Sequence, residues 1–283
     1  MPVDLHTHSR ASDGSDTPAE LVRAAAAARL GSIALTDHDT VEGIAEALEI
    51  ADQVGIELIP GTEISCEWSP GGMHMVILWL EPTSGPLQDQ LHRLQDGRNN
   101  RNSRIVEKLQ GLGLDVSLAE IEEEAGAGSV GRPHIAAVLV RKGYVPDIAT
   151  AFDEFLATGR PAYLERDRLT PEEAIMLARQ SDALPVLAHP HTLGIEDEEA
   201  LSELLGRLAG FGLVGLECHY GAYQLEERKH FESLARRNGL IPSGGSDYHG
   251  SYKEGIALGT GRGDLNVQTS VLDELRAARA GTV

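Results

Sequence analysis

The chain has 283 residues, 41% of them hydrophobic, and a formal net charge of −20 at pH 7 with histidine counted as neutral. This length and composition are those of a globular enzyme with one large α/β domain, or with one domain that carries an insertion. The acidic balance argues against a broad surface for duplex DNA or an anionic membrane, but it allows a local cationic pocket for a small phosphorylated substrate.

No stretch approaches the roughly 20 apolar residues that a membrane-spanning helix requires, and no basic-then-apolar signal precedes the first strand. We therefore expect a cytoplasmic protein without a membrane partner, and no obligate protein partner is evident. The two cysteines, Cys66 and Cys218, form no C-x-x-C motif, so both are predicted to be buried thiols rather than a disulfide or a thiolate metal site.

The first part of the chain alternates strands with helices. Strands are expected at residues 3–9, 32–35, 56–60 and 74–80. A capping box, Thr17-Pro18-Ala19-Glu20, begins the first helix, Gly31 ends it, and a second helix reaches about Val54. This alternation predicts βα units and a largely parallel sheet or barrel.

From about residue 85 helix follows helix, which predicts an inserted small helical domain. Helices are expected at 87–112, from the cap Ser117–Glu120, at 133–142 and at 147–157. The insertion is placed at 94–160, so the barrel would comprise 1–93 and 161–283. After residue 160 the alternation resumes, with a helix capped at Thr170–Glu173, strands at 185–188, 213–217 and 241–243, and a last helix at 270–280.

Nine histidines, aspartates and glutamates stand at strand ends, although one of them, His74, opens its strand. His6 and His8 are two positions apart and therefore face the same side of the first strand. Strand ends form one rim in barrels and parallel sheets, and nine ligands suit two or three ions rather than one. The predicted metal ligands are His6, His8, Asp13, His38, Glu63, His74, His189, Asp247 and His249.

Five motifs give the chain a specific resemblance. They are Asp4-Leu5-His6-Thr7-His8-Ser9, Thr36-Asp37-His38-Asp39, Gly61-Thr62-Glu63, Ala188-His189-Pro190 and Gly245-Ser246-Asp247-Tyr248-His249. In this order they resemble the polymerase and histidinol phosphatase (PHP) family. The resemblance implies an α/β fold, a distorted (β/α)7 barrel, with three divalent metal ions, of which Mn²⁺ is our first choice and Zn²⁺ or Fe²⁺ the alternatives.

The resemblance also implies how the ligands divide among the ions. The first ion would take His6, His8, Glu63 and Asp247; the second Glu63, His74 and His189; the third Asp13, His38 and His249. Many family members are similar but have histidine in place of Asp13, and the aspartate resembles a subgroup of nucleotide phosphatases. The catalytic set would be Asp13, His38, Glu63, Asp247 and His249, with metal-activated water as the nucleophile and Asp37 orienting the ligands.

The insertion should determine specificity. Arg132 and His134 stand at a helix start, where backbone N–H groups also favour an anion, and by resemblance they would bind a second phosphate that is not cleaved. Arg101, Arg104 and Lys108 form one basic stripe that adds to this pocket or, as an equal alternative, is a solvated face.

Two further kinds of histidine are predicted. His219, at a strand end, contacts substrate, protonates the leaving group or makes a structural hydrogen bond, and these alternatives stay open. His92, His191 and His230 are expected to be surface or cap residues.

The first functional hypothesis is a phosphatase that removes the 3′-phosphate of nucleoside 3′,5′-bisphosphates. The same enzyme could trim short 5′-phosphorylated oligonucleotides from the 5′ end. The alternatives are an L-histidinol-phosphate phosphatase, disfavoured because that substrate has a single phosphate, and a non-catalytic metal-stabilised interaction domain.

Overall fold

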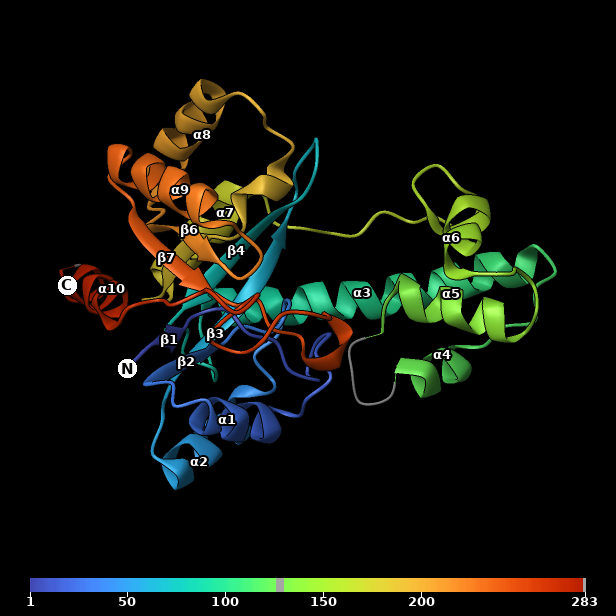
Figure 1. Cartoon of the computed structure of the whole chain (residues 1–283). Helices are drawn as coiled ribbons and strands as arrows, with labels where there is room; N and C mark the ends of the chain where they lie inside the picture. The colour runs from blue at the N-terminus through green and yellow to red at the C-terminus, as the bar shows by residue number, and fades with distance from the viewer. Residues whose placement is uncertain (126–129, 282–283) are drawn as a thin grey trace. The chain divides into compact units, whose positions relative to one another are not determined.

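The computed structural model describes residues 1–125 and 130–281 (Figure 1). Contacts divide the chain into a larger unit, Met1–Leu91 with Arg168–Val283, and a smaller unit, His92–Asp167. The predicted limits of the helical insertion are residues 94 and 160. None of the described helices is both long and apolar enough to cross a membrane.

The larger unit contains a seven-stranded sheet (Figure 1). Its strands are β1 (Val3–Asp4), β2 (Ser32–Leu35), β3 (Glu57–Cys66), β4 (Met73–Leu78), β5 (Leu184–Leu187), β6 (Gly215–Tyr220) and β7 (Ile241–Gly245). The helices are α1 (Pro18–Ala27), α2 (Ile44–Val54), α7 (Pro171–Gln180), α8 (Glu198–Phe211), α9 (Leu225–Arg237) and α10 (Thr269–Ala280), with 3₁₀ turns at Pro190–Leu193 and Gly250–Tyr252. Helix α3 (Pro86–Gly111) begins in this unit.

The strands follow one another in chain order from β1 to β7. The two ends of the sheet also meet, because Leu5 N donates to Gly244 O at 3.2 Å and Asp247 N donates to His6 O at 2.8 Å. The sheet is therefore a nearly closed barrel, which confirms the predicted fold class. The first strand is shorter than expected and ends at Asp4, although residues beyond it still make these bonds.

Strand β4 runs antiparallel to both of its neighbours, whereas the other adjacent strands are parallel. The beginning of β4 therefore lies on the same rim as the ends of the parallel strands. His74 pairs with Ser65 near the end of β3. This reversal explains how a histidine that opens its strand can join ligands that end theirs.

Local sequence signals account for much of the helical structure. Thr17 Oγ1 accepts from Glu20 N at 3.2 Å and the Glu20 carboxylate accepts from Thr17 N, so the predicted capping box starts α1. Thr170 and Glu173 do the same for α7. Helices α8 and α9 were not identified from the sequence, and α9 packs on β6 and β7.

The barrel has an aliphatic interior that α10 helps to cover. Fourteen buried residues form this core, and three of them, Val271, Leu272 and Leu275, come from α10. A second core lies between α1, α2 and strands β2 and β3. Both cysteines are buried and unpaired, as predicted, and burial raises the pKa of each thiol.

The smaller unit has its own hydrophobic core, which includes Ile105, Leu109, Ile135 and Leu139. Its elements are the rest of α3, α4 (Leu118–Ala125), α5 (Arg132–Arg141), α6 (Ile148–Ala151) and a π-helix (Phe152–Leu156). The sequence analysis expected one helix at 147–157. Asp147 caps that segment, and its second half is π-helical.

Candidate metal centre

The nine side chains predicted to be metal ligands meet in one cluster on the barrel rim. Four overlapping groups within it offer ligand atoms that lie within 4.8 Å of one another. These groups are His8, Asp13, His38 and His249; His6, His8 and Asp247; His6, Glu63 and His189; and His38, Glu63 and His74. Residues up to 243 positions apart in the sequence thus converge on one place.

Glu63 lies at the middle of this cluster, with its side chain 1% exposed. Its Oε1 is 3.0 Å from Nδ1 of His74 and 2.9 Å from Nε2 of His189. Its Oε2 lies 3.1 to 3.2 Å from ring nitrogens of three other histidines: His6, His8 and His38. Each oxygen of one carboxylate therefore faces a different set of imidazoles, as a residue bridging two ions requires.

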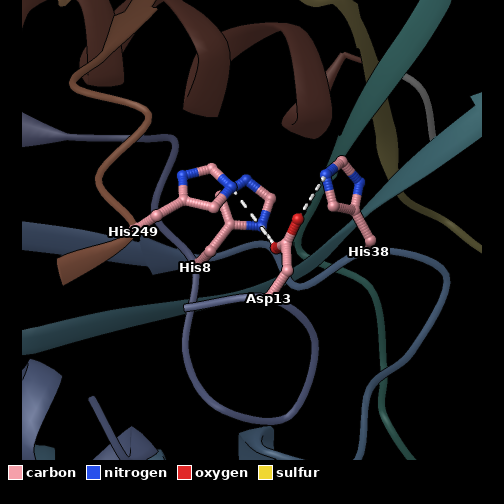
Figure 2. A group of neighbouring side chains, drawn as sticks. All are labelled: His8, Asp13, His38 and His249. Carbon is pink, nitrogen blue, oxygen red and sulfur yellow. Dashed lines mark ion pairs between the residues drawn. The ribbon is translucent and has the colours of Figure 1, made fainter. Parts of the chain in front are cut away.

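Asp13 reaches the cluster from the loop after β1 (Figure 2). Its Oδ1 lies 3.3 Å from Nε2 of His249 and 3.6 Å from Nδ1 of His8, and its Oδ2 lies 3.6 Å from Nε2 of His38. The side chain is 55% exposed. The structure thus groups the three residues predicted for a third ion and adds His8 to them.

The loop that carries Asp13 is held by the buried side chain of Asp37. Its carboxylate accepts from Ser9 N at 2.7 Å, Ser9 Oγ at 2.6 Å and Ser12 Oγ at 2.6 Å. The loop also turns so tightly at Gly14 that a Cβ there would lie 2.5 Å from His8 O. Asp37 therefore orients the loop, rather than a histidine ring.

Several buried nitrogens of the cluster lack a hydrogen-bond partner among the described residues: His6 Nε2, both ring nitrogens of His8, and His38 Nδ1. Oxygens of Glu63 and Asp247 lie 3.2 and 3.4 Å from His8 Nε2, yet neither makes a hydrogen bond with it. Buried polar atoms are rarely left in this state. Buried imidazole nitrogens that face carboxylates without a hydrogen bond, as these four do, fit bound cations.

The pKa values of the clustered side chains also indicate a site that favours positive charge. Burial lowers the pKa of His8, but the neighbouring Asp247 and Glu63 outweigh it and raise that pKa to about 10. Burial, together with the charges of His8 and His74, lowers the pKa of His38 to about 4, although the carboxylates of Glu63 and Asp13 oppose this. Burial raises the pKa of Glu63, yet the surrounding histidines hold it well below its usual range. The carboxylates thus draw positive charge into the site.

Glu217, which the sequence analysis did not select, fixes two of the histidines. Nδ1 of His6 donates to its Oε1 at 2.9 Å, and the backbone N–H of His189 donates to its Oε2 at 2.8 Å. His189 has φ 23°, and Asp247 has φ 55°, which are costly conformations for such residues. Glu217 therefore supports both the ring of His6 and the strained backbone of His189. Its position at the end of the strand predicted at 213–217 is the signal that could have identified it.

An irregularity in β6 decides which of its later side chains reach the cluster. The register shifts between Glu217 and His219, and such a bulge turns the following side chains to other faces. The charges that affect the His219 pKa belong to Glu232 and Arg228 of α9, whereas Tyr220 contacts Asp247, with its hydroxyl 2.8 Å from Oδ2. Tyr220 thus occupies the rim position for which the sequence analysis considered His219.

His191 is closer to the cluster than the expected surface role implies. Its ring centroid is 6.1 Å from that of His189, and its Nδ1 lies 2.9 Å from the hydroxyl of Tyr223. Despite these contacts, His191 as a whole is exposed to solvent.

A cavity of about 210 Å³ opens at the cluster. It is lined by His38, Glu63, His74, His189, Thr192, Tyr220, Asp247, His249 and Lys253. Thr192 Oγ1 lies 3.2 Å from Nδ1 of His189, so it orients that ring. The cavity is smaller than sites that enclose a whole drug-sized ligand, but it can hold a phosphoryl group.

The substrate-binding residues predicted in the smaller unit lie at the start of α5. Arg132 donates to Leu156 O at 3.0 Å, and its guanidinium lies over the rings of Phe152 and Tyr163 at 5.7 and 5.5 Å. His134 Nδ1 accepts from Gly131 N at 3.0 Å. These contacts hold both side chains at the helix start; their role in phosphate binding stays a prediction.

The basic stripe of α3 divides into three different environments. Arg101 is buried and donates to Asn102 Oδ1 at 3.3 Å, whereas Arg104 is exposed. Lys108 donates to the carbonyls of Pro161 and Tyr163 at 3.2 and 3.1 Å. Lys108 therefore links α3 to the last residues of the smaller unit, although Lys108, like Arg104, is exposed.

Comparisons with known proteins agree with this site. The 3′,5′-nucleoside bisphosphate phosphatase of Chromobacterium violaceum is 31% identical over 91% of this chain and 90% of its own length. The 5′-3′ exoribonuclease Rnm of Escherichia coli is 35% identical over 87% and 84%. A solved structure from Bifidobacterium adolescentis, assigned to the metal-dependent phosphoesterases, has a TM-score of 0.78 and 28% identity, covering 99% of this chain and 98% of its own.

The barrel, its rim cluster and these relatives define a phosphoric ester hydrolase of the metal-dependent class. A model of the PHP domain matches residues 4–179, which is more than half of the chain. The chain belongs to the PHP family.

Glu217 offers a test of how the cluster is held. Glu217→Gln keeps the shape of the side chain but weakens its bonds to His6 and His189, so we expect about 10- to 100-fold weaker Mn²⁺ binding. Isothermal titration of the metal-free protein measures this. Glu232→Gln, which changes a carboxylate on α9, is the matched control, and equal metal affinity in both variants would contradict the supporting role.

Proposed function

We propose that this chain removes the 3′-phosphate of nucleoside 3′,5′-bisphosphates, for example converting adenosine 3′,5′-bisphosphate to AMP and phosphate. The observation that carries the proposal is the rim cluster, in which the two oxygens of Glu63 face different sets of histidines. The bisphosphate phosphatase of Chromobacterium violaceum, 31% identical along nearly the whole chain, supports the substrate class.

The cluster would hold three divalent cations, with Mn²⁺ the first candidate. The ligand sets are His6, His8, Glu63 and Asp247 for the first, Glu63, His74 and His189 for the second, and Asp13, His38 and His249 for the third. Such ions supply the positive charge that lowers the pKa of water and neutralises phosphoryl oxygens. The unbonded buried nitrogens of His6, His8 and His38 support this assignment.

The chain's own residues would position and enclose the reacting group. Glu217 and Thr192 orient the rings of His6 and His189, so that the nitrogens needed for the ions face the carboxylate of Glu63. Because the cavity measures about 210 Å³, it would enclose the phosphoryl group and leave the base outside. Recognition of the rest of the nucleotide therefore needs residues outside this cavity.

Arg132 and His134 are our candidates for binding the 5′-phosphate that is not cleaved. The guanidinium of Arg132 contacts two aromatic rings, which restricts its motion, and a guanidinium can bind an anion by a charge-assisted bond. We assign a smaller contribution to Arg101 and Arg104.

A second activity is 5′-to-3′ trimming of short 5′-phosphorylated oligonucleotides. The exoribonuclease Rnm, 35% identical to this chain, supports it. A site that binds a 5′-phosphate and hydrolyses the neighbouring 3′ phosphoester would perform both reactions.

The proposed activity is tested by phosphate release from a substrate panel with Mn²⁺. The panel contains adenosine 3′,5′-bisphosphate, 3′-AMP, 5′-AMP, histidinol phosphate and a 5′-phosphorylated trinucleotide. We expect the highest kcat/KM for the bisphosphate, and no release after chelation with EDTA. Preference for histidinol phosphate, or equal turnover of the monophosphates, would refute the proposed specificity.

Arg132→Ala tests the second phosphate. Loss of one charge-assisted contact should raise KM for the bisphosphate by about tenfold or more with a small change in kcat, because the bond is made equally in ground and transition states. The matched control is Arg141→Ala, an exposed arginine on the same helix. Steady-state kinetics with 3′-AMP should show no such effect, since it lacks the 5′-phosphate; identical kinetics in both variants would exclude the assigned role.

Asp13→Asn separates a catalytic from a structural third ion. The amide removes the negative charge that faces His8, His38 and His249, so we expect about one metal equivalent fewer and at least about tenfold lower kcat. Because the side chain is half-exposed, the melting temperature should change by less than about 2 °C. A large fall in melting temperature with little loss of turnover would favour a structural ion.

A further inference from the structure

Lys253, in the loop after β7, lies against the metal-ligand cluster although it has no place among the ligands. Its ammonium forms an ion pair with Oδ2 of Asp247 and donates to the hydroxyl of Tyr220 at 3.0 Å. The ammonium also lies 5.3 Å from the centre of the Tyr220 ring, a cation–π contact. The end of a long flexible side chain is therefore fixed at three points.

The two oxygens of Asp247 serve different neighbours. Oδ1 faces the histidines, 3.4 Å from Nε2 of His8 and 3.7 Å from Nε2 of His6. Oδ2 accepts from the hydroxyl of Tyr220 at 2.8 Å and pairs with Lys253. Lys253 therefore leaves the oxygen that faces the cluster available to a cation.

The donor count of Lys253 leaves one N–H for a ligand. A lysine ammonium has three N–H donors and no acceptor. One donor goes to Asp247 and one to Tyr220, whose own hydroxyl proton goes to Asp247. Because Lys253 lines the cavity and its side chain is 31% exposed, the third N–H is available to a molecule in the cavity.

The charges of the side chains that line the cavity indicate which kind of ligand this N–H group would bind. Among the residues lining the cavity, Lys253 alone carries a permanent positive charge; the other side chains are imidazoles, carboxylates and hydroxyls. The carboxylates of Glu63 and Asp247 would repel a phosphate ester, and the chain as a whole carries −20. A lysine acts as a point charge toward phosphate.

We propose that Lys253 binds a non-bridging oxygen of the phosphoryl group that is cleaved, with Tyr220 and Asp247 positioning its ammonium. The inference deepens the proposed function and rests on it only in that the ligand is a phosphate ester. The competing explanation is that Lys253 merely balances the charge of Asp247 and thereby keeps that residue in place as a metal ligand.

The test compares Lys253→Met with Lys253→Arg, which keeps the charge, and with Lys229→Met. Lys229 is an exposed lysine of α9 paired with Glu226, so its variant removes the same charge away from the cluster. For each protein, metal content is measured by mass spectrometry, and the affinity for inorganic phosphate by isothermal titration of the Mn²⁺-loaded protein. Steady-state kinetics on the substrate panel follow.

We expect Lys253→Met to keep its full metal content and to bind phosphate about 10- to 100-fold more weakly than Lys229→Met, with kcat/KM falling to a similar extent. Lys253→Arg should recover most of the phosphate affinity. Phosphate affinity within about twofold of the Lys229→Met value would overturn the proposal. So would a loss of metal in Lys253→Met that accounts for the weaker binding, because that result assigns Lys253 to the metal site alone.

Failure of this inference can be told apart from failure of the proposed function. Phosphate binding does not depend on which ester the enzyme cleaves. If the wild-type protein does not cleave the bisphosphate but Lys253→Met binds phosphate weakly, only the proposed substrate is refuted. If the wild-type protein cleaves the bisphosphate and Lys253→Met binds phosphate as Lys229→Met does, only the proposed role of Lys253 is refuted.

Discussion

The burial of Glu63 is the constraint on which the rest of the site depends. A carboxylate that is 1% exposed loses the water that stabilises its charge, and this cost must be offset by positive charge and hydrogen bonds nearby. Five imidazoles surround it, and they come from the loop ends of β1, β2, β4 and β5. The sheet must therefore curl strongly, because a flat sheet could not bring the ends of β1 and β5 to one carboxylate on β3.

Closure depends on contacts between the two ends of the larger unit. Asp4, fully buried in β1, accepts from Ser246 N at 2.8 Å and from Gly259 N at 2.7 Å. These bonds fix the loop after β7, which carries Asp247, against the strand that carries His6 and His8. The same loop then brings Lys253 to the cavity. Asp4, a buried carboxylate outside the cluster, thus helps to position three ligands, His6, His8 and Asp247, and the loop that carries Lys253.

The α/β class and the rim ligands could be predicted because both depend on local signals, whereas the barrel was implied only by the resemblance to the PHP family. Alternating strands and capped helices repeat along the chain; His38 stands three residues after β2, and Glu63 lies within β3, after the predicted strand at 56–60. The direction of β4 could not be predicted in this way, since strand direction depends on pairing between segments far apart in sequence. His74 is therefore an exception in the sequence pattern, but the antiparallel direction of β4 places it on the same rim as the other ligands.

Residues that contact partners across the barrel were not predicted either, because their roles depend on contacts between segments far apart in sequence. Glu217 matters because its carboxylate meets His6, 211 positions away, and Tyr220 reaches the rim because a bulge shifts the register before it. Lys253 is six residues past Asp247 in a loop with no periodic pattern. These roles depend on long-range pairing. The barrel cavity, about 210 Å³, can enclose a phosphoryl group, so recognition of the rest of a phosphate ester must depend on contacts outside this cavity.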